Sequence, residues 1–340
     1  MTPRSFLIKL FIFSLPFLLF VGIYFYLDPF KVFKHYDRYF ESGQPPYVSR
    51  NKDVVSTENW INHFPEFQYD SYIFGNSRSI YWQVNTWKNY IHRDASKCYH
   101  FDASGESLYG VTKKILFLDS RNVKINNALL VIDYDVLHNP KPSEGHLFEK
   151  DPKTTGQNAL AFQVDCLKDF FDFQFLTAYF SLKFTGKVQE TAKRDYILDD
   201  RPFIYDYVTN EMRQDYYEEI IKKNPEDYYG PRKAVFKERD TTLQKICNVE
   251  IRRPQMEMLN AIADVFRRNQ TNVRIVISPL YDQQKLNPSD LLYLKKLFGE
   301  KNVFDFSGIN ATTNNVQNYY ETSHYRPHVS DSLMKIIYAE

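Results

Sequence analysis

Cysteine is scarce in this sequence of 340 residues. The three cysteines, Cys98, Cys166 and Cys247, are far apart, and none stands in a C-x-x-C pair. Structural zinc sites and disulfide-rich small domains both need characteristic cysteine spacings, so neither is indicated. We expect three buried thiols, although one disulfide plus one free thiol is also compatible with an oxidising compartment.

An excess of charge of one sign is missing as well. The 43 basic and 42 acidic residues nearly cancel. A protein without a net field has no long-range attraction for nucleic acid or for an anionic membrane surface. Nucleic acid is therefore not expected as a partner. The sequence also contains neither an internal repeat nor a low-complexity tract.

One long apolar run does occur, near the N-terminus. Residues 10–27 carry no charge, and Arg4 and Lys9 precede them. As a helix they would extend about 27 Å, just enough for a hydrocarbon core of about 30 Å. The run is apolar on every face and ends in bulky aromatic residues without an A-x-A site, so it predicts an uncleaved anchor rather than a core helix or a signal peptide. The preceding basic residues place the tail 1–9 in the cytoplasm and the chain after Asp28 in the periplasmic or extracellular space.

Beyond the anchor we predict an α/β domain over residues 68–340. Short apolar runs bounded by turns alternate there with helical patterns, which is typical of a three-layer α/β/α fold with a parallel sheet of about five strands. The expected strands are 71–74, 97–101, 127–137, 273–278 and 302–306. Residues 28–67 are interpreted as an aromatic, turn-rich connector. Residues 138–250, rich in charge and aromatic rings, are interpreted as a mainly helical insert that caps one end of the sheet.

A serine stands where the first expected strand meets a helix. The segment Gly75-Asn76-Ser77-Arg78-Ser79 puts Ser77 at the carboxyl end of a parallel strand, where open α/β sheets bind ligands. Amides at the start of a helix stabilise negative charge, as an attacked carbonyl oxygen requires. Gly75 permits a tight turn. The alternative is that Ser77 or Ser79 merely caps the helix.

A second loop follows the second strand, with the sequence Asp102-Ala103-Ser104-Gly105-Glu106. In a doubly wound sheet this loop would come close to Ser77. Gly105 would then let a backbone N–H approach a developing oxyanion without a side chain in the way. A turn glycine at Gly105 and a helix cap at Ser104 fit the local sequence equally well.

A third segment, residues 320–327, lies near the C-terminus. A nucleophilic serine needs a base, and the base needs a carboxylate that holds its tautomer. His324 and Glu321 are three residues apart and could supply both. His324 follows the last strand, so it belongs to the same sheet edge as Ser77, although a purely structural histidine is the alternative.

Together these segments resemble a known superfamily, the SGNH (GDSL-like) hydrolases. GNSRS (75–79), SGES (104–107) and ETSHYRP (321–327) resemble its nucleophile block, its glycine block and its closing D-x-x-H block, in that order along the chain. The resemblance covers about 68–137 and 270–340. It implies a flavodoxin-like sheet with Ser77 as nucleophile, His324 as base, and Glu321 in place of the usual Asp. It also implies backbone oxyanion donors at Gly105 and Ser77.

The G-x-N-D block of that superfamily, whose Asn donates to the oxyanion, is absent. The third strand leads instead into Asp133 and Asp135. Because an ionised carboxylate would oppose an oxyanion, we expect these aspartates to hold Arg78 or to orient the loop. Asn76 is the candidate that would substitute as side-chain donor.

A single anchor with an external domain resembles the relatives that act on cell-envelope polymers, such as alginate acetylation proteins and the teichoic acid D-alanyl transfer protein. This implies a serine esterase or O-acyltransferase, without metal or cofactor, acting on an envelope polysaccharide or glycolipid. An external transferase has no direct access to acetyl-CoA and would need a partner such as a multispanning membrane acyltransferase. The alternative is a binding or assembly protein of an envelope polymer complex that kept the fold and lost catalysis.

Overall fold

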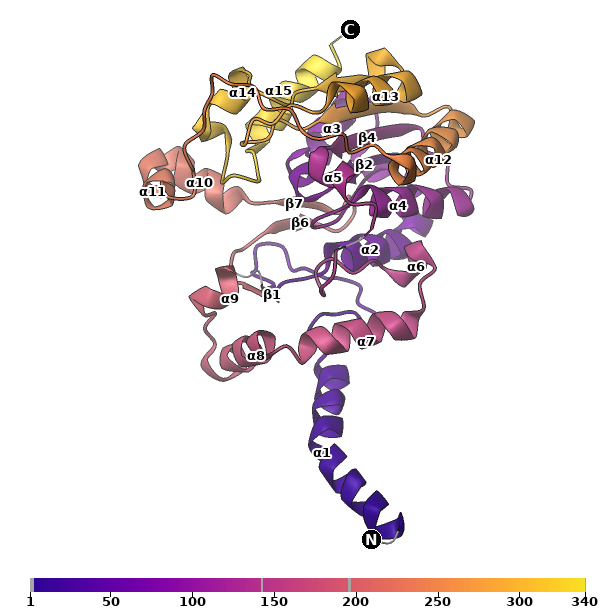
Figure 1. Ribbon diagram of the computed structural model, residues 1–340, viewed down its shortest axis with the longest axis vertical. Coiled ribbons are helices and arrows are strands. Elements are labelled where there is room, and N and C mark those ends of the chain that lie inside the picture. The colour runs from indigo at the N-terminus through magenta and orange to yellow at the C-terminus, as the bar shows by residue number, and fades with distance from the viewer. Residues whose placement is uncertain (1–2, 142, 195–196, 340) are drawn as a thin grey trace.

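The computed structural model describes residues 3–141, 143–194 and 197–339. Its centre is a parallel sheet of five strands in the order β3-β2-β4-β8-β9 (Figure 1). These strands are β2 (Ser71–Gly75), β3 (Cys98–Asp102), β4 (Asn127–Ile132), β8 (Asn272–Ile277) and β9 (Val303–Asp305). The prediction of an α/β fold with a parallel sheet of about five strands is confirmed.

Helices cover both faces of this sheet. Alternate strand residues point to opposite faces, so Phe74 and Leu130 pack in one apolar core while Ile73 and Leu129 pack in the other. The first core includes side chains of α2 (Lys52–Phe67), α4 (Leu108–Ser120), α12 (Arg253–Asn269) and α13 (Pro288–Phe298). The second includes side chains of α3 (Val84–Tyr90) and α15 (Pro327–Ile337). Burial of both faces explains why the strands read as nearly continuous apolar runs.

The register of the sheet aligns the strand ends that matter for the site. Gly75, the last residue of β2, lies beside Asp102 of β3 and Val131 of β4. The three loops that follow these strands therefore start at one edge of the sheet, the edge at which parallel α/β sheets bind ligands.

Strand β4 is shorter than the sequence predicts. It ends at Ile132, because Asp133 caps the helix α5 (Tyr134–His138) by accepting a hydrogen bond from the Val136 amide at 3.1 Å. An apolar run alone does not reveal where a buried strand gives way to a buried helix. The predicted strand over 127–137 is therefore a strand followed by a short helix.

Residues 28–67 contain more regular structure than a connector. Helix α2 occupies their C-terminal part, and Trp60 of this helix is buried in the first sheet core. Asn51 caps the helix, accepting from the amides of Asp53 and Val54. The sheet domain thus begins near Asn51 rather than at residue 68. The helical pattern is weak in the sequence because several residues on the buried face of α2 are polar.

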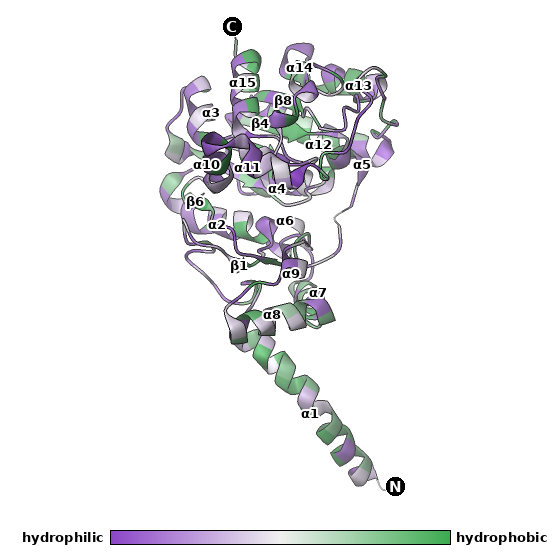
Figure 2. Ribbon diagram, turned by 90° about the vertical axis from the view of Figure 1, so that its left-hand side faces the viewer, coloured by the Kyte–Doolittle hydropathy of each residue, from purple (hydrophilic) through white to green (hydrophobic). Residues whose placement is uncertain are grey.

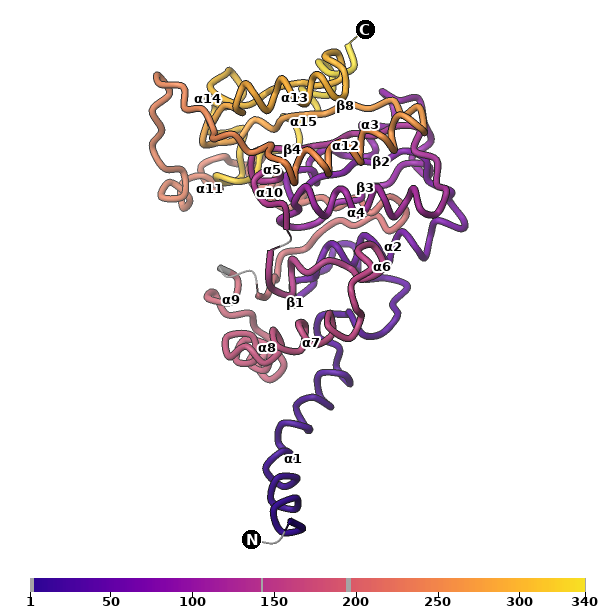
Figure 3. The backbone as a smooth tube through the Cα atoms, turned by 45° about the vertical axis from the view of Figure 1, so that its right-hand side comes forward, coloured from indigo at the N-terminus to yellow at the C-terminus, as the bar shows by residue number. Residues whose placement is uncertain are grey.

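The segment 138–250 combines helices with short strand pairs. Its helices are α6 (Pro152–Thr155), α7 (Ala159–Phe170), α8 (Phe173–Thr185), α9 (Glu190–Arg194), α10 (Asp215–Lys223) and α11 (Pro225–Tyr229). Strands β6 (Ile204–Asp206) and β7 (Glu211–Arg213) form an antiparallel hairpin, and β5 (Leu198–Asp199) pairs with β1 (Tyr47–Val48). Helices α7 and α8 lie far from the sheet (Figures 1 and 3). Helices α10 and α11 lie instead beside the C-terminal part of the chain, which includes α14 (Ala311–Asn314).

Helix α1 (Pro3–Leu27) projects away from the rest of the molecule and is apolar along most of its length (Figure 2). Its side chains are mainly exposed, and only Tyr24 is buried. The helix is long and apolar enough to span a membrane.

Candidate active site

The first site loop is held by close packing at the end of β2. A Cβ on Gly75 would lie 2.6 Å from the Val131 carbonyl oxygen and 2.8 Å from the Ser79 Cβ. Gly75 is therefore required for space rather than for a left-handed turn. Asn76 then caps the short 3-10 helix Ser77–Tyr81 by accepting from the Arg78 amide at 2.9 Å, and Ser77 is the first residue of that helix.

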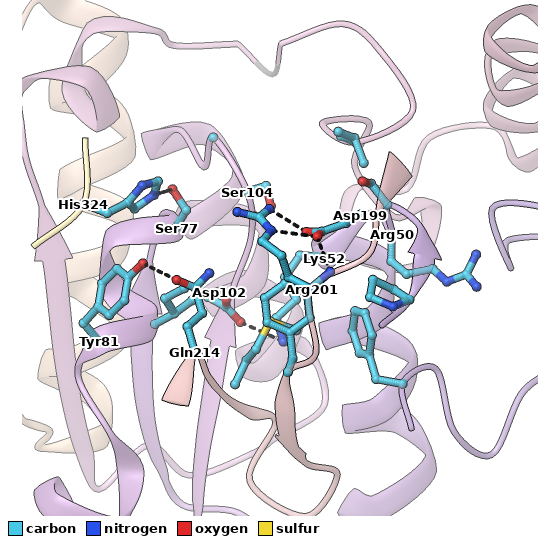
Figure 4. A pocket seen from close by; sticks show the side chains of 18 of the residues that line it. Arg50, Lys52, Ser77, Tyr81, Asp102, Ser104, Asp199, Arg201, Gln214 and His324 are labelled. Carbon is cyan, nitrogen blue, oxygen red and sulfur yellow. Dashed lines mark hydrogen bonds and ion pairs between the residues drawn. The ribbon is translucent and has the colours of Figure 1, made fainter. Parts of the chain in front are cut away.

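Ser77, His324 and Glu321 form a continuous hydrogen-bonded chain. The Ser77 Oγ lies 2.8 Å from the Nε2 of His324, and the Nδ1 of His324 bonds to the Glu321 carboxylate. An ionised carboxylate only accepts hydrogen bonds, so Nδ1 carries the proton and Nε2 accepts from the serine hydroxyl. The structure thus brings the three predicted residues together, and Figure 4 shows Ser77 and His324 side by side.

Glu321 is set up to remain ionised. Burial raises its pKa, but the hydrogen bond with His324 and the positive charge of the imidazole when it is protonated outweigh burial, and the pKa lies below its usual value. The amide of Ser323 also donates to the Glu321 Oε2 at 2.7 Å. A charged Glu321 can therefore orient the imidazole and stabilise its protonated form.

Arg78 joins the serine loop to the loop that carries His324. Its Nη1 lies 2.7 Å from Asp133, its Nη2 lies 2.8 Å from Asp135, and its Nε donates to the Ser323 carbonyl oxygen at 2.9 Å. The expectation that the two aspartates hold Arg78 is confirmed. Burial lowers the pKa of Arg78, but both carboxylates outweigh burial and raise the pKa above its ordinary value.

Asn76 is used differently from what the sequence suggests. Its amide nitrogen donates to Asp133 at 3.1 Å, and the residue is buried outside the wall of the cavity that Ser77 lines. The structure therefore does not support Asn76 as an oxyanion donor. Its side chain stabilises the loop beneath Ser77 instead.

Gly105, in contrast, lines the same cavity as Ser77. It has a left-handed backbone with φ +54°, and an added Cβ would lie 2.9 Å from the ring of Phe148. Both the conformation and the close approach require glycine here. An oxyanion-donor role for the Gly105 amide stays a prediction.

The cavity at Ser77 has a volume of about 460 Å³. Ser77 and His324 lie in its wall together with the polar groups Gln214 and Arg201, and Arg201 is paired with Asp199 at 2.6 Å (Figure 4). Apolar side chains from outside the sheet domain complete the wall: Phe40, Pro46, Leu147, Phe148, Phe203 and Met212. Sequence reasoning missed these residues, because residues 28–67 and 138–250 contain no motif.

A second serine–histidine pair lies behind the first. The Ser79 Oγ is 2.9 Å from the His100 Nε2 and also donates to the Asn76 carbonyl oxygen. Both side chains are buried, neither lines the cavity, and burial lowers the pKa of His100 to about 4. Of the two serines in the GNSRS segment, Ser77 is therefore the one that a substrate in the cavity could reach.

Buried charges support the loop that contains Gly105. Lys114 lies 2.7 Å from Glu106 and 3.0 Å from Asp53, and its Nζ donates to the Asp102 carbonyl oxygen at 2.9 Å. Lys150 also pairs with Glu106 at 2.7 Å. Removing one partner of such a network is costly, so these contacts hold the loop in place. No sequence motif indicates this cluster.

Cys98, Cys166 and Cys247 are buried free thiols. Among the described residues, no group of three or more His, Cys, Asp and Glu side chains is arranged to hold a metal ion. Comparison of the chain with models of protein families gave no match, and no curated protein matches its sequence.

Proposed function

We propose that this protein is a membrane-anchored serine esterase or O-acyltransferase of the SGNH type. The observation that carries the proposal is the chain of hydrogen bonds from Ser77 through His324 to Glu321, which opens into a cavity. The arrangement matches the requirements for an activated serine nucleophile, namely a base within hydrogen-bond reach and a carboxylate that orients the base.

In the proposed reaction, the Ser77 Oγ attacks the carbonyl carbon of an acyl ester while its proton passes to the His324 Nε2. The new C–O bond and the displaced π electrons give a tetrahedral oxyanion. Collapse of this intermediate breaks the ester bond, and His324 returns the proton to the leaving alkoxide oxygen. Water or a sugar hydroxyl then attacks the acyl-enzyme with His324 again acting as base, which restores Ser77.

Stabilisation of the oxyanion is assigned to backbone amides. Gly105 and Ser77 border the cavity, and their N–H groups are the proposed donors. Arg78 pairs with both Asp133 and Asp135 and offsets part of their negative charge, which limits their repulsion of an oxyanion.

We place the active site outside the cytoplasm. Helix α1 serves as the anchor, and Arg4 and Lys9 before its uncharged part favour a cytoplasmic N-terminus. The substrate would then be an envelope polysaccharide or glycolipid. The combination of apolar rings with Arg201 and Gln214 in the cavity suits a molecule that has both an acyl group and hydroxyls. If the reaction is a transfer, a multispanning membrane acyltransferase would supply the acyl group.

One observation favours a different class of function. The absent G-x-N-D block and the engagement of Asn76 with Asp133 leave no asparagine side chain assigned to the oxyanion. A binding or assembly protein with this fold would need no oxyanion donor. The two proposals differ in whether Ser77 is reactive.

The test is covalent labelling of the purified full-length protein by a fluorophosphonate, read by mass spectrometry, together with hydrolysis of an aryl acetate. Ser77→Ala should abolish labelling and lower hydrolysis roughly a thousand-fold or more. His324→Ala should lower hydrolysis by a similar factor, and the double variant should lose no more, because the two residues act as a unit. Glu321→Gln should show a smaller loss, since this carboxylate only orients and stabilises the imidazole.

Ser332→Ala is the matched control, because Ser332 is an exposed serine on α15 whose hydroxyl donates to the His328 carbonyl oxygen. Ser79→Ala is unsuitable, since it would leave the buried His100 without its partner. Acyl content of the envelope polymer in cells separates the two reactions: loss of an esterase raises it and loss of a transferase lowers it. Absence of labelling in the native protein, with unchanged acyl content in Ser77→Ala cells, would leave the binding-protein function.

A further inference from the structure

Helices α7 and α8 lie across α1 where α1 meets the rest of the protein (Figures 1 and 3). Each has an apolar stripe that packs inward, with Phe162 and Phe170 on α7 and Phe175 and Tyr179 on α8. These side chains share an apolar core with Tyr24 of α1. One buried stripe is what a helix on the surface of a soluble protein requires.

Each helix, together with Phe171 directly after α7, also carries a second apolar stripe that is buried only in part. The partly buried members, which pack against the same core, are Leu167, Phe171, Leu176 and Phe180. The two stripes consist of Leu160, Val164, Leu167 and Phe171, and of Phe173, Leu176, Phe180 and Phe184. Spacings of three and four residues put each set on one face of its helix. Leu160, Phe173 and Phe184 are 72%, 77% and 86% exposed. Several large exposed apolar side chains on one face of each helix indicate a surface that contacts something other than water.

Contacts with α1 show which way these stripes face. The ring of Phe171 stacks on Phe17 at 5.2 Å between centroids and lies 6.3 Å from Phe20, and Phe180 lies 6.4 Å from Phe20. Phe171 and Phe180 are partly buried members of the two stripes, one from each. Both stripes therefore face the side on which α1 continues toward its N-terminus.

The same contacts give a depth along α1. Phe20 and Phe17 precede Leu27, the last residue of the helix, by about 10 and 15 Å at 1.5 Å per residue. If residues 10–27 fill most of a hydrocarbon core of about 30 Å, both phenylalanines lie inside it. Phe171 and Phe180 must then lie at the level of lipid as well.

We infer that α7 and α8 form an interfacial platform, residues 159–185, whose exposed stripes lie in the bilayer leaflet next to the folded domain. The inference rests on the proposed anchoring by α1. Lipid is the occupant, because the stripes continue the surface of a helix that itself contacts lipid. Interfacial helices bury their apolar face about 5–10 Å into the boundary between headgroups and acyl chains. The contact with Phe20 corresponds to the deep end of this range, and the contact with Phe17 lies deeper.

The platform also links the membrane to the cavity. Strand β5 follows it in the chain and pairs with β1, and Asp199 of this strand lies in the cavity wall. With α1 alone, the domain could tilt freely on its anchor. With the platform in the interface, the cavity is held at a set height and orientation, which suits a substrate that is itself attached to a lipid.

The test uses the full-length protein in proteoliposomes of phosphatidylcholine, with and without bromine on the headgroup-proximal part of the acyl chains. Trp60, Trp82 and Trp87 are all buried in the sheet domain, so they provide a constant background. New tryptophans are introduced one at a time by Phe173→Trp and Phe184→Trp in the platform. Phe13→Trp probes α1, and Leu292→Trp probes an exposed leucine on α13, which lies at the opposite end of the molecule (Figure 1).

Brominated lipid should remove most of the emission added at positions 173, 184 and 13 and none of that added at 292. If Phe13→Trp is quenched while Phe173→Trp and Phe184→Trp behave like Leu292→Trp, the platform is refuted and the anchor stands. If Phe13→Trp escapes quenching by lipid brominated at any depth, the anchor itself fails. Accessibility of the tryptophans at 173 and 184 to aqueous iodide would show that the stripes face water rather than lipid, and would also overturn the inference.

Discussion

Replacement of Arg78 by methionine tests how Arg78 holds the loops of the site in place, without changing Ser77, His324 or Glu321. Methionine keeps much of the aliphatic stem and removes three contacts, those to Asp133, Asp135 and the Ser323 carbonyl oxygen. Asp135 is half exposed and can be solvated by water. The side chain of Asp133 is only 2% exposed, so its charge would be left buried without a cation.

The magnitude follows from what remains around Asp133. Breaking a buried ion pair by removing one partner costs about 3–5 kcal/mol. Asp133 keeps hydrogen bonds from the Asn76 side chain and the Val136 amide, which favours the lower end of this range. An upper limit comes from protonation, because protonating an aspartate at pH 7 costs about 4 kcal/mol. The expected loss of unfolding free energy is therefore about 3–4 kcal/mol at pH 7.

The buried charge of Asp133 also makes the effect of Arg78→Met dependent on pH and open to rescue by a second substitution. At pH 5 protonation of an aspartate costs only about 1.5 kcal/mol, so the stability difference between Arg78→Met and the native protein should shrink as the pH falls. Adding Asp133→Asn to Arg78→Met removes the buried charge and should restore most of the stability. Activity should not return, because the Ser323 carbonyl oxygen still lacks its donor and the loop carrying His324 is free to shift. A displacement of about 1 Å costs roughly a hundred-fold in rate.

Thermal and denaturant unfolding of the full-length protein in detergent measure the stability, and the rate of fluorophosphonate labelling measures the reactivity of Ser77. A loss of stability that is independent of pH, or that Asp133→Asn does not relieve, would refute the buried-charge argument. Labelling of Arg78→Met at the native rate would refute the role of Arg78 in holding the His324 loop.

Two further perturbations test other parts of the structure. Gly105→Ala should lower the unfolding free energy by about 1–2 kcal/mol because of the left-handed backbone alone, and its methyl group should also displace Phe148. Adding Phe148→Leu should relieve the clash with the methyl group but not the backbone cost. Thermal unfolding and the rate of fluorophosphonate labelling are the measurements. Burial lowers the pKa of His100 to about 4. Between pH 6.5 and 4 the unfolded chain therefore binds a proton at this histidine that the folded protein does not. The contribution of His100 to the unfolding free energy should fall by about 3 kcal/mol as the pH drops through this window. The pKa of the half-buried His146 is also lowered to about 4, chiefly by desolvation. His100→Gln should therefore remove about half of the dependence of the melting temperature on pH that the two histidines cause, and an unchanged slope would contradict the assignment.

Local patterns in the sequence were sufficient for several features. Short apolar runs alternating with helical spacing predicted the parallel sheet, because the burial of both its faces leaves a direct mark on each strand. The uncharged run 10–27 predicted a helix able to span a membrane, since length and composition alone decide that property. Ser77 and His324 could be paired because strands of one parallel sheet present their carboxyl ends at one edge.

Only the tertiary structure decided the rest, because the contacts involved join segments with no shared local signal. Helix α2 went unrecognised because buried polar residues weaken its apolar pattern, and Asn76 proved to bond to Asp133 rather than face the cavity. Arg78 holds the His324 loop through a backbone carbonyl oxygen, an acceptor that every residue offers and no sequence reveals. The cavity wall and the second stripes of α7 and α8 likewise acquire meaning only once folding brings residues 28–67 and 138–250 against Ser77 and α1.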